Sequence, residues 1–248
     1  MSSQPCLSEQ LLNYAISTYQ IHPIEEILQK GADPNSILNE SKDTALHIVT
    51  DASSNIIGDA QRETTIFEIT RLLISYGADV DSRNIFGETP LINAAEMRHY
   101  TIVRLLLQNG AELFATNNNR LCALANAAWY GNCENIQELL NWGAGNTQEY
   151  LKWAFNATFW NDGDYCALIL IKAGLQIGLP EAVSLIHLKD MSERCAWRDY
   201  DDLPDGVQRL NELLAEGGFT QKELKEALKV ARRHKLSGLV TELKKYIS

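Results

Sequence analysis

The stretch at residues 87–112, GETPLINAAEMRHYTIVRLLLQNGAE, contains two short helical patterns with start and stop signals around them. Thr89 is a residue type that caps a helix start, and Pro90 fits the first helical turn, where a missing N–H is harmless. Gly110 follows an apolar run and suits the left-handed backbone that commonly ends a helix. The stretch therefore predicts a helix–turn–helix unit that begins near Thr89 and ends near Gly110.

Two phrases of this stretch recur along the chain with a common step. The closing phrase, an apolar run before a glycine, places its glycines at positions 31, 77, 110, 143, 174 and 217, with intervals of 46, 33, 33, 31 and 43 residues. The opening phrase appears as TALH at 44–47, TPLI at 89–92 and CALA at 122–125, which are 45 and 33 residues apart. Two phrases that keep step in this way indicate a repeat protein.

The recurring phrases resemble the ankyrin repeat, which has a 33-residue period, a Thr-Pro-Leu-His opening and a Gly-Ala-Asp close. The resemblance is specific over residues 24–145 and weaker beyond them. It implies an all-α fold, an ankyrin-repeat solenoid of about seven helix–turn–helix units with short hairpin loops. Ala94 and Ala95 suit this fold because small side chains let neighbouring helices pack closely.

The period divides the chain into consecutive units of one ankyrin-repeat domain over residues 1–248. These units are an N-terminal capping repeat at 1–38, a repeat at 39–82 with an insertion near 51–63, repeats at 83–115 and 116–146, degenerate repeats at 147–178 and 179–218, the latter with an insertion near 189–203, and a C-terminal capping repeat at 219–248. Thr220 and Glu223 form a capping-box pattern in the last unit. Both insertions fall between the helices of their repeats, where binding loops often occur.

The charge balance is acidic, with 32 Asp and Glu against 22 Lys and Arg, a net charge of −10 and a pI of about 5.0. A general nucleic-acid binder needs a basic face, so the composition argues against that class and suits a protein partner with a basic surface. Residues 219–248 differ, because they hold eight Lys or Arg against three Glu, a net of +5. We interpret this segment as the solvated face of a terminal cap, with contact to an anionic surface as the alternative.

The number and spacing of the cysteines indicate the redox state of the compartment in which the protein acts. There are five, at positions 6, 122, 133, 166 and 195, and no CxxC spacing occurs. The odd number and the spacing indicate neither a disulfide framework nor a zinc site, so we expect a reducing, cytoplasmic compartment, or delivery into a host cytosol. No basic-then-apolar segment opens the chain, and the longest apolar run, at 166–171, is too short to span a bilayer.

The resemblance also implies a partner-binding surface, because ankyrin proteins generally bind through the concave side built from hairpin tips and first helices. Carried over position by position, this surface comprises Phe86, Glu88, Glu96, Met97, Asn119, Leu121, Trp129, Tyr130 and Trp142, with Trp160 in the degenerate repeat. Aromatic residues and Met are typical of interface cores. In the alternative interpretation, Trp129 and Trp160 fill space between irregular repeats.

The second insertion, KDMSERCAWRDYDDL at 189–203, mixes aromatic residues with carboxylates. In one interpretation Trp197 and Tyr200 bind a Lys or Arg of the partner by charge and cation–π contact. In the other, which is equally favoured, the insertion is a solvated loop whose Trp197 packs back onto the solenoid.

Catalytic and cofactor motifs are missing from the sequence, which has no HExxH, Walker loop, GxGxxG or GxSxG. His47 stands at the Thr-x-Leu-His position of the repeat, where the resemblance implies that it supports a turn. We therefore expect no catalytic residue, cofactor or metal. The alternative is an enzyme with a concealed site within 147–218, formed by Cys166, His187 or Cys195 with a polar partner.

The sequence thus predicts a monomeric, non-catalytic protein–protein interaction module. Two settings fit this prediction: a host-directed bacterial or viral effector, and an endogenous adaptor or inhibitor, which includes an acidic antidote to a basic enzyme. Gene neighbourhood separates them, because an adjacent toxin gene favours the antidote and secretion machinery favours the effector.

Overall fold

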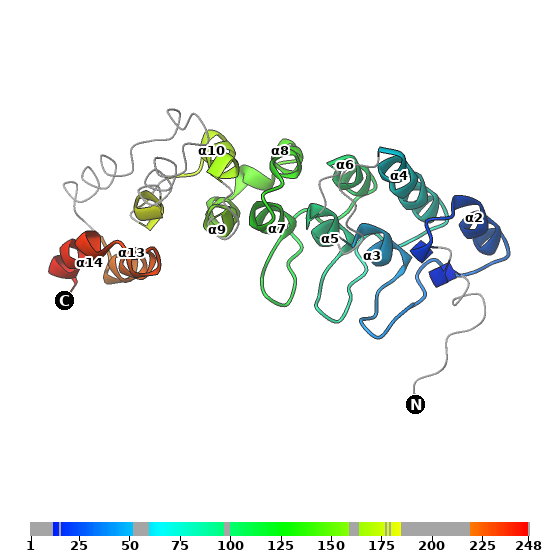
Figure 1. Cartoon of the computed structure of the whole chain (residues 1–248), viewed down its shortest axis with the longest axis horizontal. Helices are drawn as coiled ribbons and strands as arrows, with labels where there is room; N and C mark the ends of the chain where they lie inside the picture. The colour runs from blue at the N-terminus through cyan, green and yellow to red at the C-terminus, as the bar shows by residue number, and fades with distance from the viewer. Residues whose placement is uncertain are drawn as a thin grey trace. The chain divides into compact units, whose positions relative to one another are not determined.

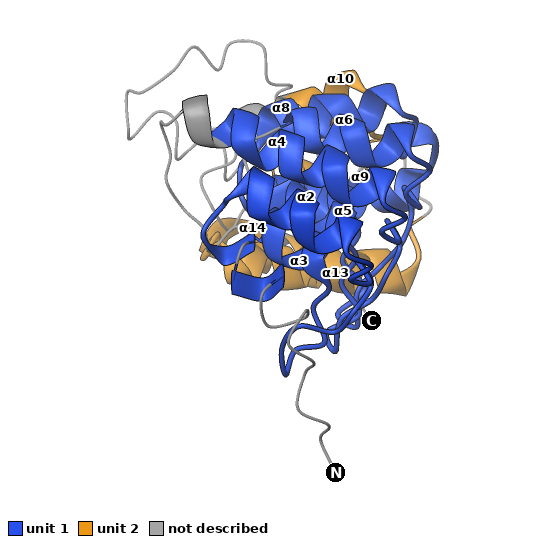
Figure 2. Ribbon diagram, turned by 90° about the vertical axis from the view of Figure 1, so that its right-hand side faces the viewer, with its two compact units in different colours: residues 1–166 blue, residues 167–248 orange. Residues whose placement is uncertain are grey.

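The computed structural model describes residues 12–14, 16–51, 60–96, 100–158, 164–176, 178, 180–184 and 219–247. The chain divides into two compact units, Met1–Cys166 and Ala167–Ser248 (Figure 2). The helices of unit 1 are α2 (Ile21–Gln29), α3 (Ala45–Thr50), α4 (Ala60–Ser75), α5 (Pro90–Glu96), α6 (Tyr100–Gln108), α7 (Ala123–Trp129), α8 (Cys133–Asn141), the 3-10 turn η2 (Ala144–Asn146) and α9 (Gln148–Thr158). Helix α10 (Asp164–Lys172) begins in unit 1 and continues into unit 2. The prediction of a single domain stays a prediction.

The helices of unit 1 form two layers (Figure 1). The first helices of successive repeats, α3, α5, α7 and α9, pack against one another in order, and so do the second helices α2, α4, α6 and α8. Leucines at equivalent positions are buried in both layers: Leu46, Leu91 and Leu124 in the first, and Leu73, Leu106 and Leu139 in the second. Burial of each leucine contributes about 2 kcal/mol. The all-α stack that the resemblance to the ankyrin repeat implies is confirmed for the described residues.

Long loops connect the layers and project on one side of unit 1, at residues 30–44, 76–89 and 109–122 (Figure 1). An asparagine organises the turn of each loop. Asn84 Oδ1 accepts the amides of Phe86 at 2.9 Å and Glu88 at 3.0 Å, and Asn39 and Asn117 accept amides in the same way. These bonds satisfy backbone donors that the loops would otherwise leave to water.

Hydrogen bonds between side chains and backbone, here called the polar ladder, connect neighbouring loops just after the ends of the second helices. Asn35 donates to the Gly77 carbonyl at 2.9 Å and accepts the Asp79 amide at 2.7 Å, and the equivalent Asp81 accepts the Glu112 amide at 2.8 Å. The next equivalent residue is Phe114, whose ring centroid lies 5.0 Å from that of Tyr150, and Tyr150 in turn lies 5.4 Å from Trp153. Aromatic packing on α9 thus replaces the ladder where η2 takes the place of a fourth long loop.

The predicted insertion near 51–63 accounts for an unusually long helix. Helix α4 has 16 residues, whereas α6 and α8 have nine each, so the last residues of the insertion lengthen the start of α4. The rest of this insertion, residues 52–59, and the whole of the insertion near 189–203 lie outside the described residues.

Unit 2 contains α13 (Gln221–Arg233), α14 (Ser237–Leu243) and the 3-10 turn η3 (Lys244–Tyr246). Its core is formed by Ala182, Val183, Leu224, Ala227, Leu228, Ala231 and Leu243. The predicted capping box is present, because the Thr220 amide donates to Glu223 Oε2 at 2.9 Å and the Glu223 amide donates to Thr220 Oγ1 at 3.3 Å. The basic side chains of α13 are exposed, as both the solvated cap and contact with an anionic surface require.

Candidate protein-interaction surface

The tips of neighbouring loops are held in register by backbone hydrogen bonds. The Ile85 amide donates to the Ser41 carbonyl and the Asn118 amide donates to the Phe86 carbonyl, both at 2.9 Å. Gly87 permits this close approach, because its φ is +73° and a Cβ there would lie 2.5 Å from the Asn118 side chain. Ile85 and Phe86, next to these bonds, are 46% and 53% exposed. The loop tips thus present apolar groups on a fixed backbone.

His47 fixes the turn behind these tips. Its Nδ1 accepts the Thr44 amide at 3.2 Å, so the proton resides on Nε2, which donates to the Glu88 carbonyl at 2.9 Å. The structural role that the sequence assigned to His47 is confirmed. The bond crosses from one repeat to the next, so it also fixes the backbone from which the Glu88 side chain extends.

Glu96 and Tyr130 form the polar centre of the surface. Asn126 Nδ2 donates to Glu96 Oε1 at 3.0 Å, and the Tyr130 hydroxyl hydrogen-bonds with the same carboxyl group. Burial raises the pKa of Glu96, with further upward contributions from the charges of Glu88 and Asp51, while the hydrogen bonds from Asn126 and Tyr130 oppose the rise. Burial is likewise the main reason that the pKa of Tyr130 is raised, followed by the charge of Glu96. Three carboxylates, of Glu96, Glu88 and Asp51, therefore create a negative field around Tyr130, a residue that is 41% exposed.

The structure brings most of the described candidate residues together on the loop tips and at the first helices. Phe86, Glu88, Asn119 and Leu121 lie on the loops, Glu96 ends α5, Trp129 ends α7, and Tyr130 follows it. Trp129 is half-buried, so it both packs against the repeat and reaches solvent. Met97, Trp160, Trp197 and Tyr200 lie outside the described residues.

Trp142 is the candidate that the structure places elsewhere. It follows the last residue of α8, a second helix, and its indole Nε1 donates to Glu138 Oε1 at 3.0 Å. Its ring is 42% exposed. Trp142 therefore belongs to the layer of second helices and does not adjoin the loop tips.

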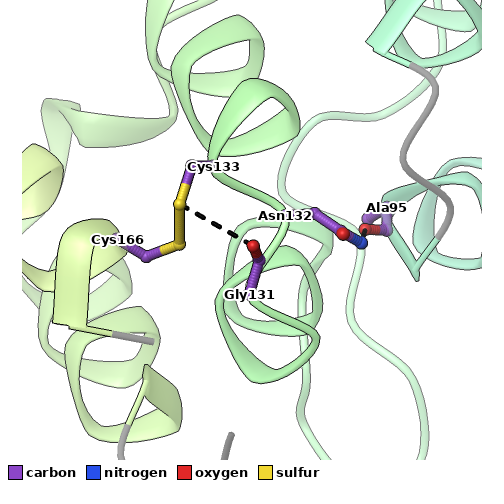
Figure 3. The surroundings of a disulfide bond; sticks show 5 residues. All are labelled: Ala95, Gly131, Asn132, Cys133 and Cys166. Atoms are coloured by element: carbon purple, nitrogen blue, oxygen red, sulfur yellow. Dashed lines mark hydrogen bonds between the residues drawn. A yellow bond between two sulfur atoms is a disulfide. The ribbon is translucent and has the colours of Figure 1, made fainter. Parts of the chain in front are cut away.

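A disulfide joins Cys133 to Cys166, with the Cα atoms 5.2 Å apart (Figure 3). The interpretation that the cysteines form no disulfide is wrong for this pair. The separation of 33 residues equals the repeat period, which places the two cysteines on the neighbouring second helices α8 and α10. The spacing was therefore the signal that could have predicted the bond. Cys122 is buried, and burial raises the pKa of its thiol.

The concealed-enzyme alternative gains no support from the described part of residues 147–218. Its candidate Cys166 is disulfide-bonded, and α9 packs against α7 in the stack of unit 1, while His187 and Cys195 lie outside the described residues. In the described ranges, no group of three or more His, Cys, Asp or Glu side chains is arranged to hold a metal ion. Among the helices that the structure describes, none is long and apolar enough to cross a membrane.

Known proteins match this chain over its repeats. The sequence profile of the family described as ankyrin repeats (3 copies) matches residues 59–149. An ankyrin repeat protein of Acanthamoeba polyphaga mimivirus is 31% identical over 119 residues, which cover 44% of this chain and 20% of that protein. An ankyrin repeat protein of Rickettsia felis is 36% identical over 83 residues, 32% of this chain and 33% of that protein.

A third relative, a protein of Oryza sativa subsp. japonica named as a ubiquitin-protein ligase, is 30% identical over 174 residues, 68% of this chain and 34% of that protein. The matches thus span between a fifth and about a third of the relatives' own lengths. Ankyrin repeats generally mediate protein–protein interaction and are generally non-enzymatic. The profile match, the named relatives and the stacked helix pairs together establish that the chain belongs to the ankyrin-repeat family.

Proposed function

We propose that this protein is a non-catalytic module that binds a partner protein through the loop tips and the adjoining ends of α5 and α7. The surface comprises Phe86, Glu88, Glu96, Asn119, Leu121, Trp129 and Tyr130. The observation that carries the proposal is the position of Tyr130, an exposed ring within the negative field of Asp51, Glu88 and Glu96.

A basic side chain of the partner suits this arrangement. An Arg or Lys near the Tyr130 ring would gain both cation–π attraction and attraction to the carboxylates. The apolar tip at Ile85 and Phe86 would supply the dry contact that such a charge pair needs around it. The net charge of −10 also attracts a basic protein at distances beyond direct contact, and so favours their encounter.

The surface requires little reorganisation on binding. Loop tips are held by hydrogen bonds between repeats, and Asn126 holds Glu96 by donating to its carboxyl group. A preformed surface avoids most of the ordering cost of association. Binding itself would then be the output of the protein, by blocking, sequestering or bridging its partner.

The proposed setting is a host-directed effector of a bacterium or virus, acting as a monomer in a host cytosol. Two of the matched relatives come from a virus and a bacterium, which supports this setting. The alternative is an endogenous adaptor or inhibitor, such as an antidote to a basic enzyme. Ligase activity is not part of the proposal, because the match to the rice protein covers 34% of that protein.

Site-specific photo-crosslinking tests which face meets the partner. Benzoylphenylalanine would replace Phe86 or Tyr130 in separate full-length proteins, and Trp142 in the matched control. We expect positions 86 and 130 to crosslink one common protein from a host or native lysate, and position 142 to leave it unlinked. Crosslinking of that protein from position 142 alone would overturn the proposed surface.

A further inference from the structure

The disulfide connects the start of α8 to the first turn of α10, within unit 1. It joins the first residue of α8, Cys133, to the third residue of α10, Cys166. Cys166 is buried, whereas Cys133 is half-buried and reaches solvent. A reagent in solution would therefore meet the Cys133 sulfur first.

The residues beside Cys133 hold the end of α5. Asn132 Nδ2 donates to the carbonyls of Ala95 at 3.0 Å and Glu96 at 2.6 Å (Figure 3 shows Asn132 beside Ala95). Asn135, in the first turn of α8, donates to the Ala95 carbonyl at 3.1 Å. The last carbonyls of a helix have no partner inside the helix, so the start of α8 supplies donors that α5 lacks. The geometry of α8 at Cys133 is thereby connected to Glu96 in the candidate surface.

The surroundings of Cys133 also fit a thiol. The Gly131 carbonyl oxygen lies 3.7 Å from Cys133 Sγ (Figure 3). A thiol is a weak donor, so a reduced Cys133 would find an acceptor already in place. The same site thus accommodates the disulfide and the thiol.

We propose that Cys133 and Cys166 form a redox-sensitive latch that sets the rigidity of the α5 end of the interaction surface. When the disulfide is formed, α8 is anchored to α10 and the Asn132 amide holds the end of α5. When the disulfide is reduced, α8 loses this anchor and the end of α5 opens more often. The functional meaning of the latch rests on the proposed function, because Glu96 is part of the proposed surface.

The oxidant in this proposal is a small-molecule disulfide such as oxidised glutathione. The Cys133 thiolate attacks one sulfur of the small disulfide, which releases one small thiol and leaves a mixed disulfide on Cys133. The Cys166 thiolate then attacks the Cys133 sulfur and releases the second small thiol. Two protein thiols lose two electrons and two protons, and the small disulfide gains them. Reduction by a small thiol follows the same steps in reverse.

Such a latch is consistent with action in a reducing compartment. Disulfides of cytosolic proteins are usually transient, catalytic or redox-sensing, whereas permanent structural disulfides occur in oxidising compartments. A delivered effector would pass through both oxidising and reducing compartments. The pairing state of Cys133 and Cys166 would then differ between these compartments.

The test uses the full chain, without a partner, at graded ratios of reduced to oxidised glutathione. Differential alkylation with mass spectrometry measures the paired fraction of Cys133 and Cys166, and hydrogen–deuterium exchange measures the opening of residues 90–96. We expect the two cysteines to titrate together, and exchange of residues 90–96 to become about threefold faster on reduction. Cys133→Ser should exchange like the reduced wild type at every ratio. Cys122→Ala, which changes a buried cysteine outside the disulfide, should respond like the wild type.

Two results would overturn the latch. In the first, Cys133 and Cys166 still react with the alkylating reagent as free thiols after treatment with excess oxidised glutathione. In the second, they form the disulfide but the hydrogen–deuterium exchange rate of residues 90–96 does not change. Both results leave the interaction surface untested, because no partner is present. Conversely, surface variants that bind a partner normally would overturn the proposed function and leave the latch measurement standing.

Discussion

Arg104 of α6 and Glu138 of α8 form a two-bond ion pair that joins neighbouring repeats. Arg104 Nε donates to Glu138 Oε1 at 2.9 Å and Nη2 donates to Oε2 at 2.7 Å. Trp142 donates to the same Oε1, and the Tyr100 ring centroid lies 5.3 Å from the guanidinium carbon. The Glu138 side chain is only 7% exposed, so its charge depends on these partners.

Loss of the cation should therefore destabilise unit 1. For Arg104→Ala we expect the thermal midpoint of the full chain to fall by about 5 °C at pH 7, because Glu138 stays buried without its partner. Arg71→Ala removes the exposed pair with Glu68 and is the matched control, with an expected fall under about 2 °C. An equal fall in both variants would contradict a special role for the pairing of Arg104 with the buried Glu138.

The same pair should be sensitive to acid. The hydrogen bonds from Arg104, which are the largest influence, lower the pKa of Glu138 below its ordinary value of 4.5. The stabilisation is therefore complete above pH 4.5 and is lost as the pH falls through the lower folded-state value. The difference in midpoint between the wild type and Arg104→Ala should accordingly shrink in this acidic range, which calorimetry at several pH values measures.

Asn132 offers a test of the connection between repeats. For Asn132→Ala we expect the free energy of unfolding in urea to fall by about 2 kcal/mol, because the part-buried Glu96 carbonyl loses its donor and the buried Ala95 carbonyl keeps only the bond from Asn135. Asn118→Ala is the control, since its amide donates to the Ile85 carbonyl in an exposed position and its loss should amount to about 0.5 kcal/mol or less. A loss at Asn132 no larger than at Asn118 would mean that water replaces the amide readily.

Much of the fold could be predicted because residues one period apart occupy equivalent packed positions in neighbouring repeats. Once Thr89 and Gly110 bound one unit, a 33-residue step placed the neighbouring repeats, and equivalent leucines such as Leu91 and Leu124 are indeed buried. The caps followed from local chemistry, as Thr220 with Glu223 illustrates. These features depend on residues close in sequence or one period apart.

The features that escaped prediction depend on how the side chains of neighbouring repeats meet. Arg104 and Glu138 pair because facing side chains of α6 and α8 meet at one level, which a sequence pattern does not specify. Trp142 was assigned to the partner surface from its place near the close of a repeat, yet the end of a second helix directs it toward Glu138. The pairing of Cys133 with Cys166 was missed because the cysteines were considered by number and not against the period.

The buried position of Glu96 predicts a stability effect of the opposite sign. Because burial raises the pKa of Glu96 above its ordinary value of 4.5, the folded state holds the proton more tightly than the unfolded state. This contribution is present below pH 4.5 and is lost as the pH rises through the folded-state value. Glu96→Gln, which keeps an acceptor for Asn126, should unfold like the wild type at pH 4 and be the more stable protein at pH 7.

Chemical denaturation between pH 4 and pH 8 measures this effect. Glu134→Gln, which removes an exposed carboxyl group from α8, is the control. If the stability of Glu96→Gln depends on pH in the same way as that of Glu134→Gln, ionisation of Glu96 costs nothing in the folded state. The polar centre would then be better hydrated than its burial indicates.

The most direct measurement is the affinity of a partner, identified by crosslinking through position 86 or 130, for three forms of the full chain. These forms are the wild type, the double variant Phe86→Ala with Tyr130→Ala, and the control Trp142→Ala. Both changed residues of the double variant are well exposed, so the fold should persist, which circular dichroism checks. We predict that the Kd of the folded double variant rises at least about tenfold, as loss of an interface anchor does, and that Trp142→Ala binds like the wild type. A folded double variant with the Kd of the wild type would contradict the account.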